Sequence, residues 1–376
     1  MELEAYQLKS LIVIAMVSGL VSAIASTIIL IMIFRSQEKL TTTFHRIMFA
    51  MCLSDIVSSL AVASSSIPTP KEDGLWLASG TTETCEIQGF LRMYGGITTP
   101  LYNCGMVIMP MIVIRYNVSR EVIRSRVEPV LLAFPFLWGT AFAVYFLMKD
   151  AFNLHTANCW VSDYPRNCHL LEEVECTRGE GVIESIPYIV IFLVAMLGVP
   201  TILVTCLVMI YVRIAKNERG EIPSTYGRVF LQRRAFSRIL VYTFAWFITF
   251  VWYLISYILS VIGTDEPFAL KVLHYIFYPL QGFMNFLVYI HPRYVVMRTL
   301  HPNQSCFKIL KYALFKRAVI YNRESASPVP AAQVINGGLM VEKETSETTP
   351  GMQKFEQYEI FHRPVLEDER MDDLIN

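Results

Sequence analysis

The chain has 376 residues, of which 54% are hydrophobic and only 17% are charged. A soluble domain of ordinary composition carries about 25% charged residues, so the composition indicates a protein whose solvent is largely lipid. The formal net charge is zero, which gives no reason to expect a nucleic-acid partner.

Apolar segments long enough to cross a hydrocarbon core, which takes about 20 helical residues, recur along the chain. They cover residues 11–34, 47–68, 87–114, 130–148, 186–212, 239–263 and 272–290. Backbone polar groups in lipid must be satisfied within the chain, so each segment is predicted to be a helix. The expected fold class is an all-α membrane protein, with a seven-transmembrane helix bundle at residues 11–290.

The distribution of Lys and Arg predicts the orientation of this bundle. Most of the basic residues that flank the spans lie in the loops after the first, third and fifth segments and after the seventh. Basic flanks mark the cytosolic side, so residues 1–10 are expected to be a short extracellular N-terminus and the C-terminus to be cytosolic. The protein is then an integral membrane protein, expected in the plasma membrane, whose basic loops contact anionic membrane lipid.

Asp55 is the only charged residue in the second segment. At about 1.5 Å per residue, it is expected at a depth similar to that of Asn285 in the seventh segment. A carboxylate at that depth needs polar partners. A purely structural contact between helices and a signalling switch both fit this pair, and the two roles are compatible.

Cysteines gather on the side predicted to be extracellular, where disulfides persist. Cys85 begins the third segment, and Cys159, Cys168 and Cys176 lie in the second outer loop. We expect a Cys85–Cys159 bridge that ties this loop over the mouth of the bundle, and a Cys168–Cys176 bridge that closes a small loop. The sequence leaves open that Cys85 is free, or that it pairs with Cys168 or Cys176.

Arg92 is the only charged residue in the third segment, and Thr99 and Asn103 share its helix face. Ionisable residues inside a span usually face the bundle interior. We therefore predict an outer ligand pocket containing these three residues and Trp160 of the second outer loop, with Glu184 as a candidate counter-charge. The alternative is that Arg92 extends outward and serves only as an anchor.

The cytosolic end of the third segment carries Arg115 and Tyr116. Composition alone favours an ordinary interfacial anchor pair, which any membrane helix can have.

The region after the seventh segment divides into two parts. Residues 291–320 have apolar residues at helical spacing interleaved with Lys and Arg, which predicts an amphipathic juxtamembrane helix on the inner leaflet. Cys306 within it is a candidate for palmitoylation. Residues 321–376 are rich in Ser, Thr, Pro, Glu and Gln and are predicted to be a disordered cytosolic tail.

Several short motifs resemble those of G-protein-coupled receptors. Residues 278–289 resemble the seventh helix of the slime-mould cyclic-AMP-receptor-like group, and the pair Gln281-Gly282 is similar to secretin and adhesion receptors. The Leu-Ser-Asp motif that ends at Asp55 resembles the second helix of many receptors. The Cys-Trp pair that begins at Cys159 resembles the second loop of the secretin and cyclic-AMP groups.

The resemblance covers roughly residues 10–317, and its departures favour the cyclic-AMP-receptor-like group over rhodopsin-like receptors. Ile114 stands where rhodopsin-like receptors have an acid before Arg-Tyr. Phe286 replaces the proline of their Asn-Pro-x-x-Tyr motif, and no proline follows Trp246.

What the resemblance implies is a receptor that transduces binding of an unknown extracellular ligand to a cytosolic heterotrimeric G protein. It implies no enzymatic activity, and no cofactor is expected. The residues expected to form the signalling switch are Asp55, Arg115, Tyr116, Asn285 and Tyr289.

Two other functions of seven-helix membrane proteins are alternatives to a receptor. A retinal protein needs a Schiff-base lysine inside residues 272–290, where the sequence has none. A membrane transporter or intramembrane enzyme would need several buried ionisable residues or metal ligands. Asp55 and Arg92 lie well inside the spans and His274 lies in the outer half of its own, so this second alternative stays open but is less favoured.

Overall fold

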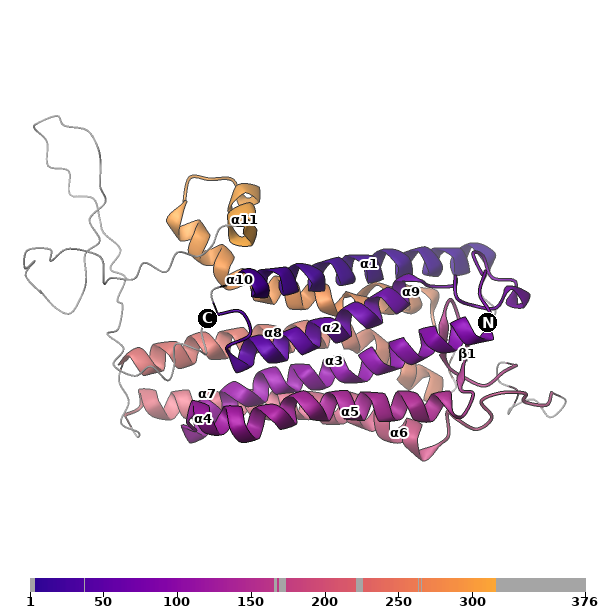
Figure 1. Cartoon of the computed structure of the whole chain (residues 1–376), viewed down its shortest axis with the longest axis horizontal. Coiled ribbons are helices and arrows are strands. Elements are labelled where there is room, and N and C mark those ends of the chain that lie inside the picture. Colours follow the sequence, from indigo (N-terminus) through magenta and orange to yellow (C-terminus); the bar gives the residue numbers. More distant parts are fainter. Residues whose placement is uncertain are drawn as a thin grey trace, which may run out of the picture.

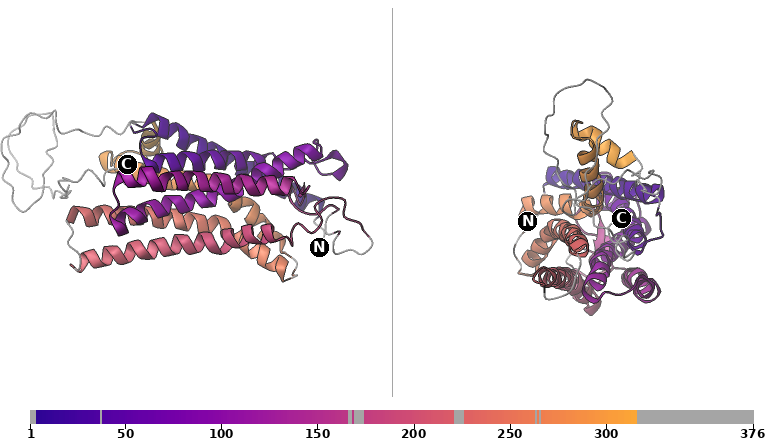
Figure 2. Two further views of the ribbon diagram at one scale, coloured as in Figure 1. Left: turned by 60° about the horizontal axis from the view of Figure 1, so that its bottom comes forward. Right: turned by 90° about the vertical axis from the view of Figure 1, so that its left-hand side faces the viewer.

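The computed structural model describes residues 4–36, 38–165, 168, 174–220, 226–262, 264 and 266–315. They form an elongated bundle of long helices that run along one axis (Figure 1, Figure 2). The predicted disordered tail, residues 321–376, lies outside the described residues, as do residues 316–320 of the predicted juxtamembrane helix.

The first part of the bundle contains the helices α1 (Ala5–Arg35), α2 (Thr43–Ala63), α3 (Thr82–Tyr116) and α5 (Glu128–Leu147). A short helix, α4 (Arg120–Val122), and a turn of π-helix, η2 (Ile123–Val127), lead into α5 without a break. A 3₁₀ turn, η1 (Lys71–Asp73), lies between α2 and α3.

The later spans are less regular. The fifth joins α6 (Ile186–Leu193), the π-turn η4 (Val194–Gly198) and α7 (Val199–Glu218), whereas the sixth is the single helix α8 (Tyr226–Val261). The seventh joins α9 (Phe268–Phe277), the 3₁₀ turn η5 (Tyr278–Leu280) and α10 (Gln281–Leu300). Among the described residues, six helical stretches are long and apolar enough to cross a membrane, and α9–η5–α10 supplies the seventh span. The predicted all-α membrane bundle is therefore confirmed.

The seventh span changes helix type at Pro279. Proline cannot donate a backbone hydrogen bond inside a helix, which explains why the regular α-helix is interrupted here. After α10, the separate helix α11 (Cys306–Phe315) turns away from the long axis of the bundle (Figure 1). Its buried Ile309 and Ala313 pack against Met32 of α1 and Met297 of α10.

Capping residues, rather than the edges of the apolar runs, decide where helices begin and end. The second span was predicted at residues 47–68, but α2 ends at Ala63. Thr42 caps its start by accepting a hydrogen bond from the His45 N–H at 3.2 Å. Ser65 has φ of 46°, a left-handed conformation that a helix cannot continue through. The prediction was wrong at both ends because apolarity reports depth in the membrane and not backbone conformation.

Glycines allow α1 to approach its two neighbours closely. A Cβ at Gly19 would lie 2.7 Å from the backbone oxygen of Ser59 in α2. A Cβ at Gly282 of α10 would lie 2.7 Å from the Ser22 hydroxyl of α1. Close backbone approach through small residues is a common way for helices to associate in lipid, where burial of apolar side chains gives little driving force.

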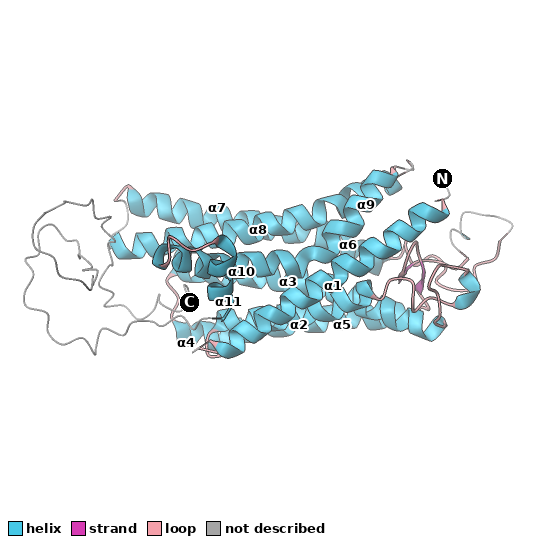
Figure 3. Cartoon of the chain, turned by 90° about the horizontal axis from the view of Figure 1, so that it is seen from above, coloured by secondary structure: helices cyan, strands magenta, loops and turns pink. Residues whose placement is uncertain are grey.

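The strands of the described structure form one antiparallel hairpin (Figure 3). It lies at the end of the bundle where α1 begins, which is called the outer end below after its predicted orientation; the opposite end is called the inner end. Strand β1 (Phe152–Leu154) pairs with β2 (Cys159–Val161). Cys159 of β2 is bonded to Cys85 at the start of α3, with a Cα–Cα distance of 5.4 Å. The structure thus contains the predicted bridge over the bundle mouth.

We expect this bridge to stabilise the fold by roughly 3–5 kcal/mol in the chain-entropy model, because it closes a long loop. Cys85→Ser and Cys159→Ser should each lower surface expression, and the double variant should be no worse than either single one. Flow cytometry with an epitope tag measures this. Additive losses in the double variant would mean that the two cysteines are not partners.

Candidate functional site

A buried hydrogen bond between Asp55 of α2 and Asn285 of α10 lies in the middle of the bundle. The Asn285 amide donates to Asp55 Oδ2 at 3.0 Å, and the two residues are 1% and 3% exposed, respectively. The structure thus places the two side chains at the common depth expected from their spacing. Because a carboxylate in this setting depends on protein partners, the bond fixes α2 against α10.

The Asn285 amide belongs to a longer series of side-chain hydrogen bonds, the polar chain, which reaches α8. Gln281 of α10 donates from Nε2 to Asn285 Oδ1 at 3.3 Å. The Thr249 hydroxyl of α8 in turn donates to Gln281 Oε1. One turn of α10 also joins α1, since the Gly282 N–H donates to the Ser22 hydroxyl at 3.0 Å. A movement of α8 or α10 would therefore disturb hydrogen bonds in several helices at once.

A small polar cavity adjoins this chain. Its volume is about 20 Å³, and its lining includes Asp55, Ser58, Thr99, Tyr278 and Gln281. A volume of this size holds about one water molecule, so the cavity has no room for an organic ligand. The cavity therefore leaves a water-sized space beside the Asp55 carboxylate.

Arg92 lies in a second polar cluster nearer the outer end of the bundle. Its Nη1 donates to the Asn158 side-chain oxygen and to the Cys159 backbone oxygen, both at 2.6 Å. Its guanidinium carbon lies 4.9 Å from the centre of the Trp160 ring, so the cation covers an aromatic face. The anchor alternative, in which Arg92 extends away from the bundle, does not fit this geometry.

The predicted pocket is divided in the structure. Thr99 lines the inner cavity, and the buried Asn103 lies a further turn along α3. The prediction joined these residues to Arg92 because they share a helix face. Seven residues of helix, however, span about 10 Å, so a shared face does not mean a shared pocket.

Glu184 is not the counter-charge of Arg92. Its side chain is exposed and lies beside Gly179, Gly181 and Val182 in a separate hollow of the outer loop. No ion pair joins it to Arg92 within the part of the chain that the structure describes.

Gln88 attaches the outer hairpin to the rest of the bundle. Its side-chain oxygen accepts a hydrogen bond from the Cys159 N–H at 2.9 Å, and its Nε2 donates to the backbone oxygens of Ala61 and Ser65. On the other side of the loop, Arg178 forms an ion pair with Glu86 of α3. The hairpin therefore has a fixed position over the Arg92 cluster.

Aromatic contacts connect the outer cluster to the interior. The Tyr278 ring lies 5.6 Å from His274 and 5.5 Å from Phe250, and Phe250 stacks on Trp246 at 4.8 Å. A Cβ at Gly96 would lie 2.9 Å from the Tyr278 hydroxyl, so the absence of a side chain there gives this tyrosine its position. Tyr278 thus contacts the outer aromatic residues and also lines the cavity beside Asp55.

The remaining predicted switch residues lie at the inner end of the bundle. Arg115 and Tyr116 are exposed, with the guanidinium 5.6 Å from the tyrosine ring, whereas Ile114 before them is buried. Tyr289, one turn beyond Asn285, is half-buried, and Arg293 lies over its ring. The inner end thus presents an exposed Arg-Tyr pair next to a packed tyrosine.

Two further contacts fix the helices at this inner end. Arg46 of α2 forms an ion pair with Glu128 at the start of α5 and donates to the backbone oxygens of Leu40 and Thr41. The Asn217 amide of α7 donates to Gln232 of α8 at 2.7 Å.

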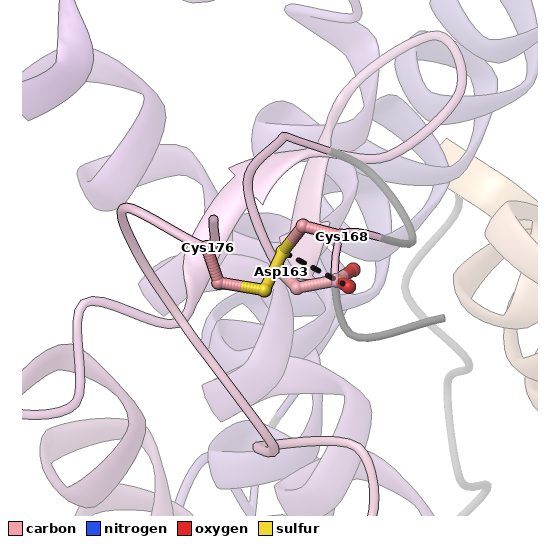
Figure 4. A group of neighbouring side chains, drawn as sticks. All are labelled: Asp163, Cys168 and Cys176. Carbon is pink, nitrogen blue, oxygen red and sulfur yellow. Dashed lines mark hydrogen bonds between the residues drawn. A yellow bond between two sulfur atoms is a disulfide. The ribbon is translucent and has the colours of Figure 1, made fainter. Parts of the chain in front are cut away.

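Asp163, Cys168 and Cys176 form the one group in the described residues with metal-ligand chemistry (Figure 4). The two cysteines are bonded to each other, with a Cα–Cα distance of 5.2 Å, as predicted for a small loop. Their sulfurs are therefore not thiolates, the form in which cysteine binds metal. The group is a loop closure beside a carboxylate rather than a metal site.

The sequence analysis did not predict three residues of the Asp55 and Arg92 clusters. Thr249 and Asn158 carry no charge and follow no motif, so no pattern marked them. Gln281 was quoted only within a family-like motif, although a glutamine inside an apolar segment is itself a signal for a buried polar contact.

No protein family model matches this chain, and no curated protein matches its sequence. Among solved structures it is similar to the crystal structure of squid rhodopsin, with a TM-score of 0.58 and 13% sequence identity. The match covers 90% of this chain and 92% of that one. At this level of identity the likeness establishes the fold alone, a helix bundle similar to that of squid rhodopsin. Together with the long apolar helices, this fold makes the chain an integral membrane protein.

Proposed function

We propose that this protein is a G-protein-coupled receptor, which transduces binding of an extracellular ligand to a cytosolic heterotrimeric G protein. The observation that carries the proposal is a series of neighbouring side chains. Arg92 lies over Trp160, Trp160 and Tyr278 both approach Gly96, and Tyr278 lines the cavity beside the Asp55–Asn285 hydrogen bond. A ligand that displaces Tyr278 at the outer end changes the lining of the inner cavity. The fold shared with squid rhodopsin supports the same reading.

Within this proposal the protein belongs to the cyclic-AMP-receptor-like group. The support is the sequence of the seventh span, together with Phe286 at the position of the rhodopsin-like proline. In the structure Phe286 packs against the inner core, and α10 continues through it without a break. The cytosolic region fits a receptor as well. Lys308 and Lys311 of α11 are exposed toward the expected headgroup region.

Cys306 at the start of α11 is proposed as an acylation site. Its side chain is exposed, and hydrogen bonding to Tyr294 and Arg298 lowers the pKa of its thiol. A lower pKa raises the thiolate fraction, which is the reactive form. A lipid at this position would add to the attachment of α11 to the membrane.

The orientation follows from the basic loops and is tested by labelling. An epitope tag placed after Met1 should bind antibody on intact cells, whereas a tag after Asn376 should bind only after permeabilisation. Flow cytometry of both cell preparations gives the answer. The opposite pattern would place the Arg92 cluster toward the cytosol and remove the receptor proposal.

The resting state should depend on the Asp55–Asn285 bond, because Ile114 supplies no acid beside Arg115. Asp55→Asn removes the carboxylate of a buried charged hydrogen bond, a change that typically costs a few kcal/mol. A shift of only about 1.4 kcal/mol changes a two-state ratio tenfold. We therefore expect altered basal G-protein activation per surface receptor, measured by nucleotide exchange. Wild-type basal activity in this variant would assign the pair a structural role only.

Arg115 should contact the G protein directly. Arg115→Ala should lose coupling at unchanged surface level, and Arg126→Ala, which removes another exposed arginine near the inner end of the bundle, should couple normally. The measurement is basal and stimulated G-protein activation in cells, screened with extracellular metabolites and peptides. Normal coupling by Arg115→Ala would make Arg115 an interfacial anchor. Substrate flux in vesicles without G-protein activation would favour the transporter alternative.

A further inference from the structure

Arg92 has hydrogen-bond donors on one edge that the protein does not use. Its Nη1 is occupied by Asn158 and Cys159, but its Nε is buried and makes no hydrogen bond to any described residue. Its Nη2 likewise makes none within the described part of the chain. The Nε–Nη2 edge of a guanidinium is the fork that binds two oxygens of a carboxylate or phosphate at once.

The charge of Arg92 is not compensated by the acids around the outer end. Glu86 and Asp150 both face Arg178, and Glu266 accepts a hydrogen bond from Ser256. A cation inside a membrane bundle usually has an anionic partner, and removal of such a partner is costly. Among the described residues, no acid forms an ion pair with Arg92.

The side chains around Arg92 are aromatic and remain partly accessible. Trp160 lies beneath the guanidinium, and Tyr253 and His274 approach each other at 5.2 Å between ring centres. All three are half-buried although they come from different elements that converge on this level. Each of these side chains therefore keeps part of its surface uncovered by the protein.

We propose that the open edge of Arg92 binds the carboxylate or phosphate of a small extracellular ligand whose aromatic part lies among Trp160, Tyr253 and His274. This inference rests on the proposed receptor function for its biological meaning, but the binding itself does not require a G protein. An anion here satisfies the two idle donors and neutralises the buried charge. A neutral molecule of the same shape leaves the charge uncompensated, so the site selects against it.

The test uses the purified full chain in lipid nanodiscs with three small probes: benzoate, phenyl phosphate and benzamide. Benzamide is the neutral isostere of benzoate. The thermal unfolding midpoint is followed up to about 20 mM probe, since ligands of this size bind weakly. Stabilisation by ligand follows from mass action, so each titration yields an apparent Kd. Benzoate, phenyl phosphate or both should raise the midpoint, which identifies the preferred anion, and benzamide should not.

The matched variants separate specific binding from general effects of anions. Arg92→Gln should weaken binding of the preferred anion by about tenfold or more, the worth of a charge-assisted hydrogen bond. Arg92→Lys keeps the charge without the fork and should bind with intermediate affinity. Arg178→Gln removes an arginine that is already paired with Glu86 and should respond as the wild type does. If Arg92→Gln does not fold, the comparison between Arg92→Lys and the wild type still decides the question.

Three results would overturn the inference: no stabilisation of the wild type by either anion, equal stabilisation by benzamide, or an unchanged response when Arg92 is replaced. Failure of the receptor proposal gives a different result. In that case the anions still bind through Arg92, but no G protein is activated. Conversely, an activating ligand that is neutral and insensitive to Arg92→Gln would leave the receptor proposal standing and remove this inference.

Discussion

The hydrogen bond between Asp55 and Asn285 is the interaction on which the arrangement of the spans depends most. In lipid a buried polar group can be satisfied only by the protein, so the carboxylate requires α10 at this depth and in this rotation. Gln281 links this hydrogen bond to α8 through Thr249. Gly282 links α10 to α1 through the Ser22 hydroxyl. Helices that share such a chain cannot move independently. The small cavity beside it leaves a water-sized space next to the carboxylate. In the proposed receptor, a second arrangement of these hydrogen bonds would be the basis of a two-state switch.

The two polar regions differ in how their charged residue is partnered. At the level of Asp55 the carboxylate has its amide partner, and the amides are bonded to one another. At the level of Arg92 the hairpin is fixed by a disulfide and by Gln88, yet the arginine beneath it keeps an unused edge and no anionic partner among the described residues. A carboxylate with a hydrogen-bond partner stabilises one arrangement, whereas a cation without an anionic partner raises the energy of the unliganded state. In the proposed receptor, binding of an anion would release that cost at the outer end. Tyr278, which lies between this level and the inner cavity, would then transmit the change inward.

The helix bundle and the Asp55–Asn285 pair could be predicted from the sequence, because the requirement for solvation by lipid leaves simple patterns in it. Apolar length identified the spans, and the common depth of Asp55 and Asn285 followed from the rise of a helix. The predictions that failed concerned the ends of α2 and the membership of the ligand pocket, which depend on individual side chains and on loop conformation. Thr42 sets the start of α2 and Ser65 follows its C-terminal end, and the apolarity of a segment reports neither position. Thr99 shares a face with Arg92 but lies two turns deeper, and Glu184 belongs to a loop whose path no periodicity describes. Neutral partners such as Thr249 and Asn158 carry no signal until the helices are assembled.

The central claim is that this polar chain holds the inner ends of the helices in one of two arrangements. Spin labels at Val122→Cys and Ser237→Cys, both exposed positions at the inner ends of α4 and α8, allow that separation to be measured in a Cys306→Ser background. Asn285→Ala removes the amide that joins Asp55 to Gln281, so a buried carboxylate loses its partner at a cost of about 1–3 kcal/mol. Pulsed electron paramagnetic resonance should then show a second, longer distance at a population severalfold above that in the parent protein. A single distance distribution, identical with and without Asn285, would contradict the claim.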